Sequence, residues 1–183
     1  MYIRNIINKT MIFKRIITEN DPMFNTAIGL YKISFPIHEQ RENKSQIEIL
    51  GHANYHFNII YDNDCFVGII LYWETNEFIY IEHFAIDPNL RNGGYGSKVL
   101  KQLTDKEKIL ILEIDPPIDE ISIRRKGFYE RIGFCENTYA HIHPPYQTNF
   151  EGHKLMVLSH PNIINQQTYT MFKTYLDDTV MNI

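Results

Sequence analysis

The chain has 183 residues, of which 44% are hydrophobic and 13% aromatic, a composition that supports one domain with a substantial buried core. Its formal net charge is -4 and charges of both signs are interspersed, which excludes the basic footprint of a nucleic-acid-binding protein or of a protein held on an anionic membrane. The sequence has two cysteines, no signal-peptide segment and no apolar run near the roughly 18 residues of a membrane span, so we expect a cytoplasmic protein without a disulfide scaffold.

The N-terminal part of the sequence predicts a tail, a strand and two helices. Residues 1–10 precede the first strand-like pattern, MIFKRIIT, which begins at Met11, and we expect them to be an appended tail. The dipeptide Asp21-Pro22 has the residue types of a helix N-cap and first turn, so a helix is predicted from there to Pro36. A second, more polar helix is expected from His38 to about His52.

The middle of the sequence predicts an antiparallel meander. The segment YHFNIIYDNDCFVGIILYWE offers two strands joined by the turn residues Asp62 to Asp64. A third strand, EFIYIEHFAIDP, follows the short turn at Thr75-Asn76. If this strand alternates regularly, Tyr80, Glu82, Phe84 and Ile86 share one face, and Ile79, Ile81, His83 and Ala85 share the other.

The remaining sequence alternates helices with strands. An amphipathic helix is predicted after the glycine turn, followed by the nearly continuous apolar strand KILILEID, and then by a helix from about Asp119 to Arg131 that ends at Gly133. AHIHPP and HKLMVLSH are expected to close the sheet as a hairpin, and Asn162 to Leu176 to form a last helix. We therefore predict an α/β (α+β) fold with a mixed, mostly antiparallel central sheet and helices on both faces.

The stretch FAIDPNLRNGGYGSKVLKQL carries three glycines between a strand and a helix. A helix N-terminus presents unpaired N–H groups, and glycines allow a phosphate to approach the backbone, so this turn is a candidate pyrophosphate site. A Walker loop does not match, because Gly96-Ser97-Lys98 has the wrong residue order. A dinucleotide-binding fingerprint fails at its third glycine, where Val99 stands, although Asp115 lies about twenty residues further on.

Two motifs in this order resemble those of the GNAT superfamily of acyl-CoA N-acyltransferases. The first is Arg-x-x-Gly-x-Gly, formed by Arg91, Gly94 and Gly96, and the second is FYERIGF at Phe128 to Phe134, which is similar to the family's Tyr-x-x-x-Gly-Phe. The order of strands and helices from residue 11 to residue 160 resembles the family fold as well. This division leaves 11–160 as the acetyltransferase domain and 161–183 as a C-terminal helical extension.

The resemblance implies acetyl-CoA as co-substrate. It implies that the strand Phe78 to Ile86 diverges from the strand Ile109 to Ile114, so that the pantetheine arm lies in the gap. Backbone groups of the first strand would hold the arm and polarise the thioester, and amides of the glycine turn would bind the pyrophosphate. The implied binding residues are Phe84, Ala85 and Ile86 on the strand, and Arg91, Asn92, Gly93, Gly94, Tyr95, Gly96 and Ser97 in the turn.

Two residues are candidates for the chemistry. The resemblance makes Tyr129 the general acid for the leaving thiolate; the alternative is a tyrosine with its ring in the core and its hydroxyl in water. Glu82 interrupts an apolar strand, where a carboxylate is costly unless it is paired or faces a cavity. It is therefore a candidate general base, or else an acidic residue paired with a neighbouring strand.

Several polar clusters leave alternatives open. His141, His143 and His153, with Cys135 nearby in sequence, raise the question of a metal site, but their spacing is not a strong ligand pattern and we expect no metal. Arg124, Arg125 and Lys126 precede the tyrosine motif and either reach the CoA phosphates or form a solvated helix face. The C-terminal segment, with Ile164, Tyr169, Phe172 and Leu176, either forms a homodimer contact or packs on its own domain.

Together these features predict an N-acetyltransferase that moves an acetyl group from acetyl-CoA directly to a primary amine of a small molecule or a protein, with no nucleic acid or membrane involved. The competing interpretation is a non-catalytic acyl-CoA-binding module with a sensor or structural role. A nucleotide-dependent oxidoreductase is a more distant alternative, which the missing third glycine disfavours.

Overall fold

The computed structural model describes residues 10–182, and the predicted tail, except for Thr10, lies outside the described residues. The central element of the described part is a seven-stranded sheet. The strand order is β1-β2-β3-β4-β5-β9-β6. Every pairing in this sheet is antiparallel except that of β4 with β5, which confirms the predicted fold class. The sheet strands are β1 (Ile12–Ile16), β2 (Tyr55–Asp62), β3 (Cys65–Glu74), β4 (Phe78–Ile86), β5 (Ile109–Ile114), β6 (Cys135–Asn137) and β9 (Met156–His160).

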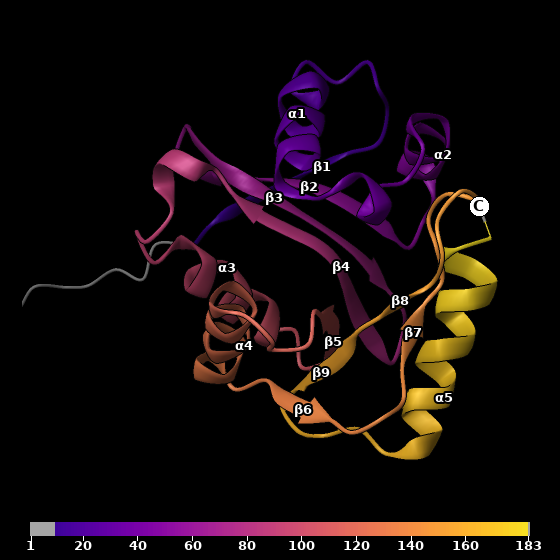
Figure 1. The fold of residues 1–183 in the computed structure, drawn as a ribbon. Helices are drawn as coiled ribbons and strands as arrows, with labels where there is room; N and C mark the ends of the chain where they lie inside the picture. The colour runs from indigo at the N-terminus through magenta and orange to yellow at the C-terminus, as the bar shows by residue number, and fades with distance from the viewer. Residues whose placement is uncertain (1–9, 183) are drawn as a thin grey trace, which may run out of the picture.

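Helices cover both faces of the sheet, as Figure 1 shows for α1 and α2 on one side and α3 and α4 on the other. One core cluster joins α1 and α5 to the sheet, and a second joins α3 to its opposite face. The helical elements are α1 (Phe24–Ser34), η1 (Ile37–Glu39), α2 (Asn43–Glu48), η2 (Ile49–Gly51), η3 (Pro88–Leu90), α3 (Tyr95–Thr104), α4 (Glu120–Ile132), α5 (Gln166–Tyr175) and η4 (Leu176–Val180).

Local sequence signals explain where several elements begin and end. The turn between β2 and β3 places Asn63 at φ 55°, a conformation that asparagine tolerates better than most residues. The Asp119 side chain accepts hydrogen bonds from the backbone N–H groups of Ile121 and Ser122 at the start of α4. At the other end, Gly133 adopts φ 102°, as glycine commonly does just after a helix.

Helix α3 forms although a glycine stands in its first turn. A glycine costs roughly 0.5–1 kcal/mol relative to alanine inside a helix. This cost is offset by burial of three side chains. Val99, Leu100 and Leu103 are fully buried, and burying each such side chain contributes roughly 1.5–3 kcal/mol. Packing of the apolar face therefore stabilises α3 even though Gly96 stands in its first turn.

The predicted boundaries need correction in three places. The helix expected from residue 38 to 52 consists of three short pieces, η1, α2 and η2. The N-cap of α1 is Met23 rather than Asp21, whose carboxylate instead accepts the Met23 N–H at 2.8 Å. The expected closing hairpin exists only as the two-residue strands β7 (Ile142–His143) and β8 (His153–Lys154), while β9 pairs with β5 and with the unpredicted β6.

The C-terminal segment packs on its own domain. Ile164 is 7% exposed, and Phe172, Leu176 and Val180 are fully buried in the same core cluster as α1. Of the two interpretations of this segment, the structure therefore supports the intramolecular one.

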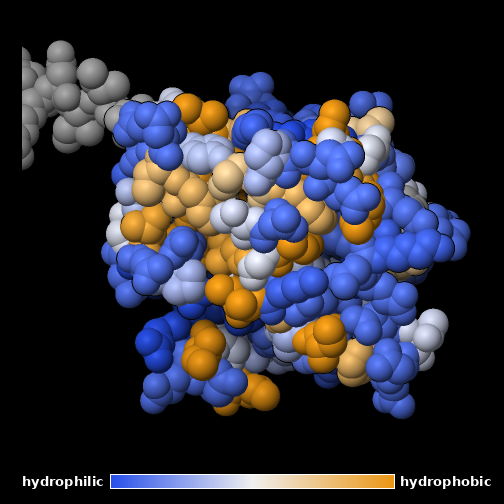
Figure 2. Space-filling view, turned by 90° about the horizontal axis from the view of Figure 1, so that it is seen from above, coloured by the Kyte–Doolittle hydropathy of each residue, from blue (hydrophilic) through white to orange (hydrophobic). Residues whose placement is uncertain are grey.

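The outer surface facing the α1 side carries separate hydrophobic areas among largely hydrophilic residues (Figure 2). Exposed isoleucines on β1, α1 and η1 are Ile12, Ile33 and Ile37. Among the helices described between residues 10 and 182, none has the length and apolar character that crossing a bilayer requires.

Candidate active site

The parallel strands β4 and β5 separate before either strand ends. Their pairing ends at Ile81 with Leu112, yet β4 continues to Ile86 and β5 to Ile114. The backbone groups on the β5 side of residues 82–86 therefore have no strand partner within the described chain. A cavity of about 800 Å³ opens at this divergence. The divergence that the family resemblance implied is thus confirmed.

A β-bulge lies at the point of divergence. Leu71 pairs with His83 and Tyr72 pairs with Ile81, so Glu82 is an extra residue with no partner on β3. An extra residue shifts the two-residue side-chain period and increases local twist. Consistent with this, Glu82 bonds to Trp73 while His83 contacts Tyr31, both in the core cluster on the α1 side.

The bulge overturns the regular alternation predicted for this strand. Phe84 and Ile86 pack with Ile79 and Ile81 against the α3 side, and Ala85 belongs to the cluster of Tyr80 on the α1 side. The prediction was wrong beyond Glu82 because a uniform period of two cannot represent an inserted residue. As a result, the strand presents Glu82 and His83 in succession toward the same face.

The glycine turn forms one wall of the cavity. Gly94, the N-cap of α3, adopts φ 76°, and Asn92 adopts φ 64°. Tyr95, Gly96 and Ser97 form the first turn of α3, where backbone N–H groups have no intrahelical acceptor. At Gly96, an added Cβ would lie 3.0 Å from the Phe128 ring. The missing Cβ of Gly96 therefore leaves room for the Phe128 ring, and the turn offers unpaired amides that fit an anionic group such as a pyrophosphate.

The cavity brings together most of the residues that the sequence singled out. Gly93 is the exception: it does not line the cavity, and its N–H points to the Leu90 carbonyl at 3.4 Å. The predicted residues in the cavity wall are Glu82, Phe84, Ala85, Ile86, Arg91, Asn92, Gly94, Tyr95, Gly96, Ser97 and Tyr129.

Tyr129 faces the cavity from α4. Its ring contacts Phe128 and Phe134, with ring centroids 5.1 and 5.6 Å away. Burial raises the pKa of the Tyr129 hydroxyl to about 12, so this hydroxyl is protonated at neutral pH. Within residues 10–182 the hydroxyl has no hydrogen-bond partner, in contrast to the buried tyrosines Tyr55 and Tyr80. It is free to donate to a ligand.

Glu82 is surrounded by donors. Its Oε1 accepts from Arg41 Nε at 3.1 Å, from Arg41 Nη2 at 2.9 Å and from the Tyr146 hydroxyl at 3.0 Å. Its Oε2 accepts from Trp73 Nε1 at 2.9 Å. Burial acts to raise the pKa of the Glu82 carboxyl, but the Arg41 charge and these hydrogen bonds outweigh it, and the net shift is downward. The carboxylate is ionised and fully satisfied.

Arg41 was missed by sequence reasoning. It follows η1 in a polar stretch, yet its side chain is 3% exposed and it also donates to the Val180 carbonyl at 2.6 Å. Its guanidinium lies over the Tyr146 ring at 5.1 Å. Arg41 therefore links the segment after α1 with β4 and the C-terminal end of the chain.

Glu113, on β5, is a second buried carboxylate in the cavity wall that sequence reasoning missed. It accepts hydrogen bonds from the Tyr80 hydroxyl and from His141 Nε2, and His143 Nε2 lies 3.8 Å from its Oε2. Burial raises the pKa of the Glu113 carboxyl, whereas the interactions with His143 and His141 lower it more strongly. The net shift is downward, so Glu113 is also ionised. Like Glu82, Glu113 interrupts an apolar run, ILILEID, where a carboxylate is costly unless it is paired or faces a cavity.

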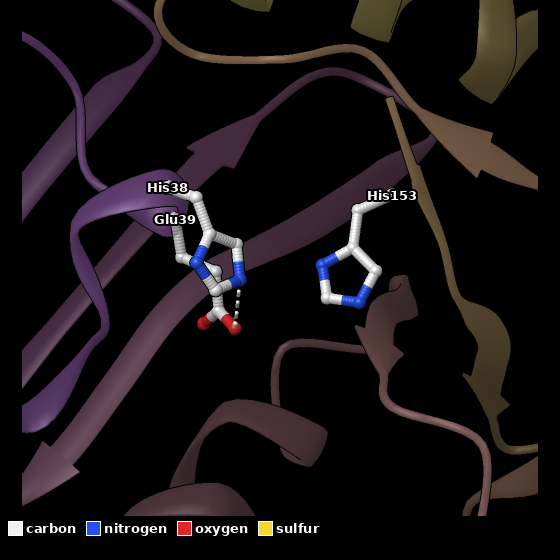
Figure 3. Close-up of side chains that lie close together, drawn as sticks. All are labelled: His38, Glu39 and His153. Carbon is white, nitrogen blue, oxygen red and sulfur yellow. Dashed lines mark ion pairs between the residues drawn. The ribbon is translucent and has the colours of Figure 1, made fainter. Parts of the chain in front are cut away.

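The histidines considered for a metal site divide between two places. His141 and His143 face Glu113, whereas His153 lies opposite His38 and Glu39 (Figure 3). One donor atom from each of His38, Glu39 and His153 falls within 4.8 Å of the others, an arrangement that is open to a divalent cation. His153 Nε2 is also 3.4 Å from Asp115 Oδ1.

The basic residues of α4 are engaged with acidic neighbours. Arg125 Nη1 lies 2.7 Å from Asp115 Oδ2 and also lines the cavity. Arg124 pairs with Glu120 one turn earlier, and Lys126 pairs with Glu130 one turn later. Arg124 and Lys126 therefore form the predicted solvated helix face, and Arg125 alone of the three lines the cavity.

The sheet opens between β4 and β5 beside the glycine-rich N-terminus of α3, an arrangement that indicates an acyltransferase. Comparison with known proteins supports this class. The sequence profile described as "Acetyltransferase (GNAT) family" matches residues 20–134. The chain belongs to this family of acetyltransferase enzymes. The nucleotide-dependent oxidoreductase is thereby set aside.

Two relatives extend the match over most of the chain. A solved structure named "Putative acetyltransferase from GNAT family from Bacteroides thetaiotaomicron" is 34% identical, has a TM-score of 0.87, and the match covers 94% of this chain and 99% of that chain. "Putative acetyltransferase YjbC" of Bacillus subtilis (strain 168) is 27% identical over 157 residues, which is 79% of each protein.

A more distant structure shares the fold and was solved with a ligand. The GNAT family acetyltransferase from Elizabethkingia anophelis, with acetyl-CoA bound, has a TM-score of 0.55 and 16% identity, and the match covers 82% of this chain and 95% of that chain.

Proposed function

We propose that this protein transfers the acetyl group of acetyl-CoA directly to a primary amine. The observation that carries the proposal is the cavity at the divergence of β4 and β5, whose wall includes the glycine turn at the N-terminus of α3. Support for the choice of co-substrate comes from the acetyl-CoA bound to the Elizabethkingia anophelis enzyme of the same fold.

The glycine turn would bind the pyrophosphate through the first-turn amides of α3. The unpaired backbone of residues 82–86 would hold the pantetheine arm in the gap and donate to the thioester oxygen as it gains negative charge. This use of β4 accounts for the early end of its pairing with β5. Free strand groups buried without a partner would otherwise be costly.

Acetyl transfer requires the amine nitrogen to form a bond to the thioester carbon, the carbon–sulfur bond to break, and the thiolate to take up a proton. Tyr129 is the proposed donor of that proton, since this residue lines the cavity and its hydroxyl is protonated and has no partner within the described chain. No covalent enzyme intermediate is needed.

Glu82 takes a positioning role in this proposal. A carboxylate that already accepts from Arg41, Trp73 and Tyr146, and whose pKa is lowered, has little affinity for the amine proton. Its position on the bulge instead holds Arg41 and, through a hydrogen bond, the cavity residue Tyr146. The ion-pair interpretation of Glu82 is therefore the one we adopt.

The test is a panel of primary amines that includes polyamines, amino acids, aryl-alkyl amines and peptides with free N-termini. Each is incubated with acetyl-CoA, thiol release is followed, and the acetylated product is verified by mass spectrometry. Acetylation of at least one class above the rate without enzyme supports the proposal. Tight acetyl-CoA binding with no product from any class would instead favour a non-catalytic acyl-CoA-binding module.

A further inference from the structure

The two histidines that face Glu113 differ in how their ring nitrogens are used. His141 has a partner at both nitrogens: Nε2 bonds to Glu113, and Nδ1 lies 3.0 Å from the Tyr169 hydroxyl. Among residues 10–182, His143 has a partner only at Nδ1, while its Nε2 is buried without a hydrogen bond. An unsatisfied polar atom buried beside a cavity is uncommon in folded proteins and calls for an explanation.

The partner of His143 Nδ1 determines where the ring proton lies. Nδ1 is 2.5 Å from the Pro144 carbonyl oxygen, and a carbonyl can only accept a hydrogen bond. Nδ1 therefore carries the proton in the neutral ring, and Nε2 presents an unshared electron pair. The His143 side chain is 6% exposed and His143 is one of the residues that line the cavity, so the residue that carries this electron pair borders the ligand space.

Glu113 is placed to stabilise the protonated form of His143. Its Oε2 lies 3.8 Å from His143 Nε2, and its own hydrogen bonds from Tyr80 and His141 hold it in place. An ionised carboxylate at this distance supplies a counter-charge to a proton that is transferred to Nε2 during the reaction. The ring of His143 is also held by Tyr146, with centroids 4.7 Å apart.

The other basic groups in the cavity wall are less suitable. His83 also has a buried ring nitrogen, Nδ1, without a hydrogen-bond partner among residues 10–182. However, its Nε2 donates to the Glu39 carbonyl at 2.9 Å and burial lowers its pKa to about 4, so it does not readily take up a proton. Glu82 is occupied by three donor residues. Within residues 10–182, His143 thus combines a free nitrogen, a cavity position and a neighbouring carboxylate.

We infer that His143 is the general base of the proposed acetyl transfer and that Glu113 is its positioning residue. As the amine nitrogen bonds to the thioester carbon, the ammonium proton passes to His143 Nε2, the carbon–sulfur bond breaks, and the thiolate takes the Tyr129 proton. The imidazolium then returns its proton to the medium, and Tyr129 regains one. The net products are the acetylated amine and CoA. This role rests on the acetyl transfer proposed above.

Several titratable or charged groups are packed around His143. Besides Glu113 on β5, they include Tyr80, Glu82 and His83 on β4, His141 just before β7, His153 opposite His143 on β8, Tyr146, and Arg41 beside the Tyr146 ring. A pH profile must therefore be compared with that of a matched variant.

The matched control is His160. Like His143 it has a buried ring nitrogen, Nδ1, without a partner in the described part of the chain, but it lies on β9 and does not line the cavity. With the amine that gives the highest turnover, His143→Gln should lower kcat about 100-fold, as expected for loss of a general base. It should also abolish the acidic limb of the kcat/KM profile while leaving the acetyl-CoA Kd unchanged. His160→Gln should retain both the turnover and the limb.

A second readout does not need an acceptor. Long-range proton–nitrogen NMR spectra report the tautomer of each ring, and His143 should carry its proton on Nδ1 whereas His141 should carry it on Nε2. An Nε2–H tautomer at His143 would overturn the assignment. So would full turnover and an intact acidic limb in His143→Gln when the wild type is active. If the wild type acetylates no amine, the proposed function fails, and the role of His143 fails with it.

Discussion

The Arg41 guanidinium and the Glu82 carboxylate form a buried ion pair, with Nη2 and Oε1 2.9 Å apart and with 3% and 0% of their side chains exposed. Glu82 reaches this position because it is the extra residue of a β-bulge. The pair joins the segment after α1 to the strand that borders the cavity, and Arg41 continues the link to the Val180 carbonyl. One side of the candidate active site therefore depends on this contact.

Replacing Glu82 by glutamine should destabilise the protein. The substitution preserves size but leaves the Arg41 charge buried without a counter-charge, which typically costs about 3–5 kcal/mol of unfolding free energy. Urea denaturation followed by circular dichroism measures this loss. The control is Glu77→Gln at an exposed turn, where a change below about 0.5 kcal/mol is expected.

The double variant Arg41→Met with Glu82→Gln separates the charge effect from packing. Removing both charges should recover part of the stability lost in Glu82→Gln, because no charge is then left buried without a counter-charge. Equal stability of Glu82→Gln and the wild type would contradict the account of this pair.

Acid should destabilise the fold through Glu82 and Glu113. Both carboxyls have folded-state pKa values below their ordinary value of 4.5. The stability they contribute is therefore fully present above pH 4.5 and is lost as the pH falls below 4.5 toward the folded-state values. Urea midpoints measured between neutral pH and acid should fall over this range, and the fall should be smaller in the double variant of Arg41 and Glu82. A midpoint independent of pH below 4.5 would be inconsistent with these shifts.

Replacing Tyr129 by phenylalanine should affect turnover much more than binding. The ring and its contacts with Phe128 and Phe134 remain, while the proton donor is lost, so kcat should fall about 100-fold. Acetyl-CoA affinity from calorimetry should change little. Tyr61→Phe on β2, outside the cavity, is the control. Unchanged turnover in Tyr129→Phe would remove this residue from the mechanism.

Replacing Gly94 by alanine should weaken acetyl-CoA binding. Its φ of 76° costs a non-glycine residue about 1–2 kcal/mol, so the turn should either strain or change shape. A matching loss of affinity of about tenfold corresponds to 1.4 kcal/mol. Gly29→Ala, inside α1 with no atom within 4 Å of the added Cβ, should bind acetyl-CoA as the wild type does. Identical affinity in the two variants would show that the turn does not hold the ligand.

Chelation should leave acetyl transfer intact. The side chains of His38, Glu39 and His153 lie close together (Figure 3) in residues that line the cavity, and no step of the proposed reaction uses them. Activity is compared before and after dialysis against a chelator, with metal content measured in the same samples. Loss of activity that returns on adding a divalent cation would require a different mechanism.

The sequence predicted those parts of the fold that local patterns determine. The turn at Asn63, the helix start at Asp119 and the helix end at Gly133 all depend on residues within a few positions of one another. The glycine turn and Tyr129 were likewise found from short motifs. Their common cavity follows from the topology that the same motifs implied.

The features that were missed depend on contacts between distant residues. Arg41 lies 41 positions from Glu82 and 139 from Val180, so its polar segment shows no sign of burial. The bulge at Glu82 is a property of how β3 pairs with β4, and the alternation within β4 does not reveal it. The role proposed for His143 depends on its position beside Glu113 on another strand. Glu113 itself could have been found from the sequence, because it is an acidic residue in an apolar run.

Calorimetric titration of the wild-type protein with acetyl-CoA, with NAD and ATP as controls, tests the central claim most directly. Binding at the divergence of β4 and β5 predicts a saturable heat with acetyl-CoA, at least about tenfold tighter than with either control, and a weaker response in Gly94→Ala. Absence of heat and of thermal stabilisation with acetyl-CoA, or tighter binding of NAD, would contradict the account.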